Sequence, residues 1–195
     1  MEPLELIEKY YPKDSKAYHF LIKHSELVTQ KALQIAARVM DMNPDIAFIR
    51  SASMLHDIGI FLTDDPRLGC FGDKPYLAHG YLGRELLEKE GLEKYALVCE
   101  RHVGVGISLD DIVKNKLPLP QRDMLPITLE EKIICFADKF YSKAKHSLLS
   151  EKTVPQIRGE IAPYGPEKLN QFDEWLVLFK EPCSEASASA SVADS

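Results

Sequence analysis

Apolar residues recur along most of this chain at intervals of three, four and seven positions, which is the spacing of one face of an α-helix. Between Asp14 and about Met40 this spacing predicts a long helix, with apolar residues at Ala17, Leu21, Val28, Ile35 and Val39. The segment Asn43-Pro44-Asp45 then resembles an N-cap, a proline at the first helical position and an acid in the first turn. We therefore expect a second helix that continues to about Asp57 and ends at Gly59.

Further helices are predicted by the same spacing together with capping signals. They cover residues 77–90 before Gly91, 92–102 before Gly104, a short stretch capped at Ser108, 128–147 behind the capping box Thr128-Leu129-Glu130-Glu131, and 166–179. Residues 60–76 show no period and are expected to form a loop, and three prolines at 118, 120 and 126 predict an extended connection. No strand pair is expected, so the fold class is an all-α helical bundle.

Composition agrees with one folded domain. The chain has 195 residues, of which 45% are hydrophobic, and this supports a single core over residues 1–182. Residues 183–195 are dominated by serine and alanine and are expected to form a disordered tail. The net charge of −6 lacks the basic excess of a general nucleic-acid binder.

The compartment is expected to be the cytoplasm. No basic segment followed by an apolar stretch opens the sequence, and no apolar run approaches the length of a membrane span. The cysteines Cys70, Cys99, Cys135 and Cys183 form no CxxC pair, which favours free thiols in a reducing environment. The sequence leaves the oligomeric state open.

Six polar residues occupy positions on apolar helix faces where aliphatic side chains are expected. They come from five predicted helices and are His24, His56, Asp57, His79, His102 and Asp138. Burying so many polar groups costs several kcal/mol unless they satisfy one another, and a metal ion satisfies neutral imidazoles and carboxylates at one point. We therefore expect the six to converge on a metal site.

The pair His56-Asp57 lies at a predicted helix end, where both side chains can turn into one cleft. A carboxylate has two oxygens, so Asp57 can join two cations while His56 binds one of them. That arrangement suits a bridged metal pair about 3.5–4 Å apart, as used in two-metal hydrolysis.

These residues resemble the HD superfamily of metal-dependent phosphohydrolases, and its HDIG-type branch in particular. The resemblance spans about residues 19–145 and includes His56-Asp57-Ile58-Gly59 and the stretches ERHVGVGI and TLEEKIICFADKF. It implies an HD-type helical bundle in which His24, His56, Asp57 and Asp138 hold one metal. In dinuclear members two further histidines bind a second metal, and His79 and His102 match them, with Asp57 as the bridge.

One position departs from this pattern. Many dinuclear members carry a lysine that assists with the substrate phosphate, where this chain has Ile60. Arg84, Arg101 and Lys139 lie near ligands in the sequence and are the candidates to replace it at the substrate.

The function expected is hydrolysis of a phosphoester in a nucleotide or other small phosphorylated metabolite, with Asp57 and His56 at the catalytic centre. Two divalent transition-metal ions are implied, iron or manganese first, with nickel, cobalt or zinc also suited to the ligands. Two alternatives stay open: an HD-fold di-iron oxygenase acting on a small organic or phosphonate substrate, and a nucleotide-binding regulator without turnover.

Overall fold

The computed structural model describes residues 2–141 and 150–182 and confirms the all-α fold. The helices are α1 (Pro3–Tyr10), α2 (Lys16–Arg38), α3 (Ile46–Leu55), α4 (His79–Lys89), α5 (Glu93–Arg101), α6 (Leu109–Lys114), α7 (Leu129–Asp138), α8 (Val154–Ile161) and α9 (Pro166–Leu178). Short 3-10 turns lie at η1 (Met40–Met42), η2 (Ile58–Leu62), η3 (Tyr76–Ala78) and η4 (Ala162–Tyr164).

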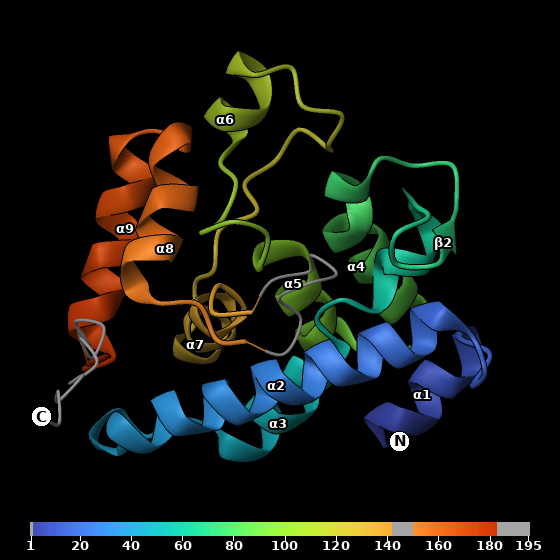
Figure 1. Cartoon of the computed structure of the whole chain (residues 1–195), viewed down its shortest axis with the longest axis horizontal. Coiled ribbons are helices and arrows are strands. Elements are labelled where there is room, and N and C mark those ends of the chain that lie inside the picture. Colours follow the sequence, from blue (N-terminus) through green and yellow to red (C-terminus); the bar gives the residue numbers. More distant parts are fainter. Residues whose placement is uncertain (1, 142–149, 183–195) are drawn as a thin grey trace, which may run out of the picture.

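The helices surround two adjoining apolar clusters. In Figure 1 the long helix α2 runs along one edge of the molecule with α3 beside it, and α8 and α9 pair at the end away from α1. One cluster joins α2, α3, α7 and α9 around Ile35, Phe136 and Phe172. The other joins α1, η2 and α4 around Ile7, Ile60 and Leu87. Each cluster supplies part of the frame that positions the polar residues between them.

The helix that precedes His56 begins later and ends earlier than predicted. Its N-cap is Asp45, whose side chain accepts a hydrogen bond from the Phe48 backbone N–H at 2.9 Å, while Asn43 adopts a left-handed conformation with φ 53°. Helix α3 ends at Leu55, and Gly59 lies inside η2 rather than ending the helix. Gly59 is required for a different reason, since an added Cβ would lie 2.3 Å from the His79 carbonyl oxygen and 2.5 Å from the Gly83 nitrogen.

The expected loop over residues 60–76 contains more structure than its composition indicates. The turn η2 enters it, and two-residue strands β1 (Asp64–Asp65) and β2 (Cys70–Phe71) pair antiparallel, so the expectation of no strand pair is wrong. Helices α1 and α8 are also absent from the sequence prediction. Helix α1 has only eight residues, and α8 begins at a capping box of Thr153 and Gln156 whose signal was available in the sequence.

The capping box at Thr128 is confirmed, because its hydroxyl accepts a hydrogen bond from the Glu131 backbone N–H. Helix α7 nevertheless ends at Asp138 and not at Ser147, since Lys139 is its C-cap and Tyr141 pairs with Glu151 in a β-bridge. Residues 142–149, which this prediction also covered, lie outside the described residues. The predicted tail 183–195 lies outside them as well.

Candidate metal centre

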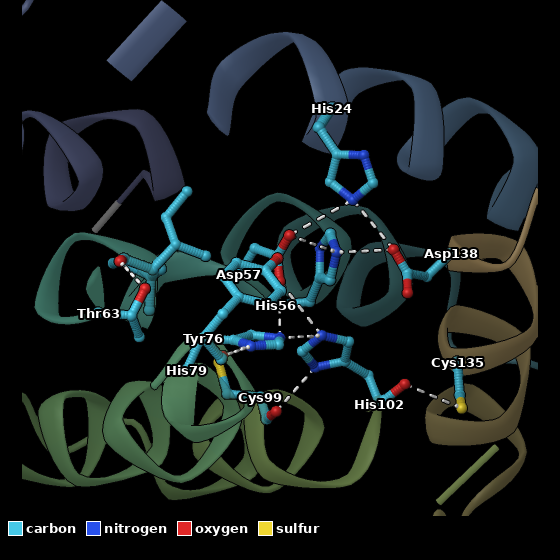
Figure 2. A network of polar contacts seen from close by, with 12 residues as sticks. His24, His56, Asp57, Thr63, Tyr76, His79, Cys99, His102, Cys135 and Asp138 are labelled. Atoms are coloured by element: carbon cyan, nitrogen blue, oxygen red, sulfur yellow. Dashed lines mark hydrogen bonds and ion pairs between the residues drawn. The ribbon is translucent and has the colours of Figure 1, made fainter. Parts of the chain in front are cut away.

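The structure brings all six polar residues predicted as ligands to one place. His24 comes from the middle of α2, His56 and Asp57 follow the end of α3, and Asp138 closes α7. His79 opens α4 and His102 follows α5. Figure 2 shows the six side chains turned toward one another, and none is more than 6% exposed. Residues 114 positions apart, His24 and Asp138, are in direct contact.

Asp57 lies between two histidine pairs and presents a different oxygen to each. Its Oδ1 lies 3.3 Å from Nε2 of His79 and 3.2 Å from Nε2 of His102. Its Oδ2 lies 3.4 Å from Nε2 of His24 and 3.6 Å from Nε2 of His56. Asp57, His79 and His102 therefore form one group able to hold a metal ion, and Asp57, His24 and His56 form another.

Three of the imidazoles are oriented by the backbone. Nδ1 of each lies within hydrogen-bond distance of the carbonyl three residues earlier: His56 to Ser53 at 2.7 Å, His79 to Tyr76 at 2.6 Å, and His102 to Cys99 at 2.7 Å. With Nδ1 donating to a carbonyl, a neutral ring keeps the lone pair of Nε2 for the opposite direction. All three Nε2 atoms then face the centre, and such a backbone partner is typical of metal-ligating histidines.

The contact between His79 and His102 fits a cation. Their Nε2 atoms lie 3.2 Å apart, and with both Nδ1 atoms donating elsewhere two neutral rings direct lone pairs at each other. Burial lowers the pKa of His102 to about 3, so this ring stays neutral near pH 7. Two imidazole nitrogens beside a carboxylate oxygen form a donor set that a divalent transition metal satisfies.

Asp138 contacts His24, His56 and Lys139. Its Oδ1 lies 3.0 Å from Nε2 of His24 and 3.5 Å from Nε2 of His56, which adds a carboxylate to that group. Its other oxygen, Oδ2, forms an ion pair with Nζ of Lys139 at 2.8 Å. Lys139 also donates to the His102 carbonyl at 3.3 Å, so this ammonium contacts residues of both groups.

A residue that sequence reasoning missed holds the turn after Asp57. The buried hydroxyl of Tyr11 donates to the Ile58 carbonyl at 2.6 Å and accepts from the Phe61 backbone N–H at 3.2 Å. Tyr11 follows α1, a helix that the periodicity does not predict, and no motif marks the contact. Tyr76, also not predicted, packs its ring 4.6 Å from the ring of His79 and supplies the carbonyl for that histidine.

The three candidates for substrate contact differ in position. Arg84 pairs with Glu88 and Glu100, and Arg101 pairs with Glu131 at 2.8 Å. Neither arginine lines the cavity beside the centre, whereas Lys139 does. Ile60 is fully buried in the cluster around α1 and η2. Of the three candidates, Lys139 is therefore the one that a molecule in the cavity could contact.

A cavity of about 770 Å³ opens from the His79 and His102 side of the centre. Its wall at the centre includes His79, His102, Asp138 and Lys139, and it extends to residues of α6, α8 and α9. A space of this size accommodates a small organic molecule. The arrangement can therefore bring one end of such a molecule to the paired histidines.

The comparisons with known proteins agree with this geometry. The model of the HD domain matches residues 21–142, which is more than half of the chain, and the chain belongs to this family of metal-dependent phosphohydrolases. HD domains bind divalent metals, and the two groups around Asp57 are able to hold them.

Among curated relatives, the chain is 36% identical over 121 residues to the uncharacterized protein MJ0778 of Methanocaldococcus jannaschii. It is also 31% and 32% identical, over 149 and 132 residues, to tRNA (cytidine(56)-2'-O)-methyltransferases of Thermoplasma volcanium and Picrophilus torridus. The matches cover 60%, 76% and 67% of this chain and 64%, 38% and 34% of those proteins. No solved structure matches the chain.

Two further findings concern the expected environment. Over residues 2–141 and 150–182, no helix combines the length and apolar character that crossing a bilayer requires. Cys70, Cys99 and Cys135 are buried free thiols, as predicted for three of the four cysteines. Burial raises the pKa of the Cys135 thiol to about 12, which keeps it protonated and unreactive.

Proposed function

We propose that this chain is a metal-dependent phosphohydrolase that hydrolyses a phosphoester in a nucleotide or another small phosphorylated metabolite. The observation that carries the proposal is the position of Asp57, whose two carboxylate oxygens face separate histidine pairs. Two divalent ions bound there would supply a water of lowered pKa and offset the charge on the phosphoryl oxygens. The imidazole and carboxylate donors suit iron or manganese, and also nickel, cobalt and zinc.

Each side chain has a distinct role in this proposal. Asp57 and His56 form the catalytic centre, with Asp57 shared by both metal positions. His24 and Asp138 complete the inner position, and His79 and His102 complete the one that faces the cavity. Lys139 lies at the cavity wall with its ammonium 2.8 Å from Asp138 and is positioned to donate a hydrogen bond to a phosphoryl oxygen.

Methyl transfer is not part of the proposal. The two relatives with that activity in their names are two to three times longer than the region they share with this chain, which spans 38% and 34% of them. The part of this chain that matches a family model is an HD domain. We infer the function from the metal-ligating residues of that domain.

The test is a substrate panel with the full chain loaded with manganese or iron. Nucleotides, cyclic nucleotides and phosphomonoesters are assayed for phosphate release or ester cleavage, with and without oxygen, and with Asp57→Asn as the inactive control. We expect hydrolysis of at least one class at the same rate in air and under anaerobic conditions. Oxygen consumption with an oxidised product would instead identify an oxygenase, and nucleotide binding without turnover would identify a regulator.

A further inference from the structure

Over residues 2–141 and 150–182, the lysines and carboxylates in the wall of the cavity form ion pairs with one another. Among the described lining residues the cations are Lys139, Lys152 and Lys168, and the carboxylates are Asp111, Asp138 and Glu160. Each lysine contacts one of these carboxylates: Lys139 and Asp138 at 2.8 Å, Lys152 and Glu160 at 2.6 Å, and Lys168 and Asp111 at 2.5 Å. The ammonium of Lys168 also donates to the Gly106 carbonyl at 2.8 Å.

These pairs are unequally placed with respect to the metal centre. Lys139 and Asp138 belong to it, whereas the other two pairs lie on α6, α8, α9 and the segment before α8. A phosphoryl group at the centre meets Lys139 and the metal positions. At the centre, the metal positions compensate a phosphoryl group that disturbs the pair of Lys139 and Asp138. Farther along the cavity, among the residues that the structure describes, a second phosphoryl group would meet lysines that already have a carboxylate partner and no metal position, so it must break an ion pair or lose hydration without that compensation.

The surface between these pairs is mostly apolar and includes aliphatic side chains, with Tyr76, Tyr141 and Tyr164 also in the lining. It is lined by Leu77, Val103, Val105, Ile107, Ile157 and Ile161. Burying an apolar or aromatic group against such a surface lowers the free energy of binding, whereas a sugar hydroxyl or an anion placed there contributes no such term. The volume of about 770 Å³ leaves room for such a group beside a bound phosphoryl group.

We infer that the cavity takes organic phosphates with a single phosphoryl group on an apolar or aromatic body, and selects against a second phosphoryl group at the far end of that body. The inference deepens the proposed function and rests on it for the phosphoryl end. Within the substrate class proposed above, it disfavours compounds with a second phosphoryl group at the far end of the body.

Binding tests the inference without requiring turnover. The manganese-loaded full chain is titrated calorimetrically with benzylphosphonate, with 1,4-xylylene diphosphonate, whose second phosphonate lies across the ring, and with 2-hydroxyethylphosphonate. We expect benzylphosphonate to bind about fivefold or more tighter than either of the others, a difference of the size expected for an uncompensated charge or a lost apolar contact. Equal or tighter binding of the diphosphonate would overturn the inference.

A substitution that frees a lysine should weaken the selection. Glu160 is 59% exposed at its side chain and pairs with Lys152, which is 17% exposed. In Glu160→Gln we expect the affinity for the diphosphonate to rise about two- to fivefold relative to benzylphosphonate, the range of a partly exposed ion pair. The control is Glu88→Gln, since Glu88 is also a half-exposed partner in an ion pair, with Arg84 at 2.7 Å, but does not line the cavity.

The failures of the two proposals are distinguishable. Preferential binding of benzylphosphonate, without hydrolysis of benzyl phosphate or of any compound in the substrate panel, would contradict the hydrolase and leave the inference standing. Hydrolysis of phosphoesters together with a preference for the diphosphonate, or an unchanged ratio of affinities in Glu160→Gln, would contradict the inference and leave the hydrolase standing.

Discussion

The two histidine pairs around Asp57 are built by different parts of the molecule. His24 and His56 belong to α2 and the end of α3, which pack together and against α7 in the larger apolar cluster. His79 and His102 belong to α4 and α5, consecutive helices that pack on each other, and only 23 residues separate them. Both of the latter line the cavity, and His24 and His56 do not.

This difference separates a buried half of the centre from an accessible half. The inner half requires contacts between distant segments, since His24 meets Asp138 across 114 residues. The outer half is a local pair of helices whose position depends on how closely α4 approaches η2. Substitutions should therefore affect the two halves to different extents, and Asp57 alone should affect both.

The largest effect is expected for Asp57→Asn. The substitution keeps the shape of the side chain but removes the charge that each metal position shares, so both metals and all hydrolysis should be lost. Disrupting even an indirect partner of a metal costs about 10–100-fold in affinity or activity, and a shared ligand costs more. Elemental analysis of the purified variant checks this; retention of one full metal equivalent would show that Asp57 serves only one half.

Gly59→Ala should move the outer half. The new Cβ would lie 2.3 Å from the His79 carbonyl oxygen and 2.5 Å from the Gly83 nitrogen, both backbone atoms of α4. We expect a loss of about 1–3 kcal/mol or more in the free energy of unfolding, together with weaker binding of one metal. The control is Gly159→Ala on α8, where an added Cβ meets nothing within 4 Å. Equal melting temperatures for the two variants would contradict the close approach.

The pH dependence of the metal-free protein should report on His102. The unfolded ring has a pKa near 6.5, and burial lowers the pKa in the folded protein to about 3. Between these values the unfolded state takes up a proton that the folded state excludes. The contribution of neutral His102 to the free energy of unfolding is therefore fully present above pH 6.5 and is lost as the pH is lowered toward 3. The slope is at most about 1.4 kcal/mol per pH unit. Denaturant unfolding from pH 7 to pH 4 should show a shallower slope in metal-free His102→Ala; identical slopes would contradict a neutral His102.

The smallest effect is expected for Tyr11→Phe, which alters the turn that follows Asp57. It removes the hydroxyl that donates to the buried Ile58 carbonyl and accepts from the partly buried Phe61 N–H, and leaves each backbone group with one partner fewer. The expected loss is about 1–3 kcal/mol in the free energy of unfolding. Tyr18→Phe is the matched control, because its hydroxyl makes only a 3.3 Å contact with Glu8 near the surface. Similar losses in both variants would show that Tyr11 does not hold the turn.

Much of this arrangement could be predicted from the sequence, and the exceptions have physical reasons. Polar residues on the apolar faces of periodic helices identify the six residues that the structure brings together. Arg84 and Arg101 could not be placed, because their partners Glu100 and Glu131 depend on how α4, α5 and α7 pack. The sequence predicts a helix end at Gly59, because it does not show that the His79 carbonyl oxygen of α4 lies 2.3 Å from where a Cβ would be.

The central claim is that Asp57 separates two metal positions, of which the outer one depends on His102. The most direct measurement is the metal content of His102→Ala beside that of the wild-type chain, after loading with manganese and removal of excess ion. The account predicts two equivalents in the wild type and one in the variant, held by His24, His56, Asp57 and Asp138. Two equivalents with normal turnover in His102→Ala would contradict it.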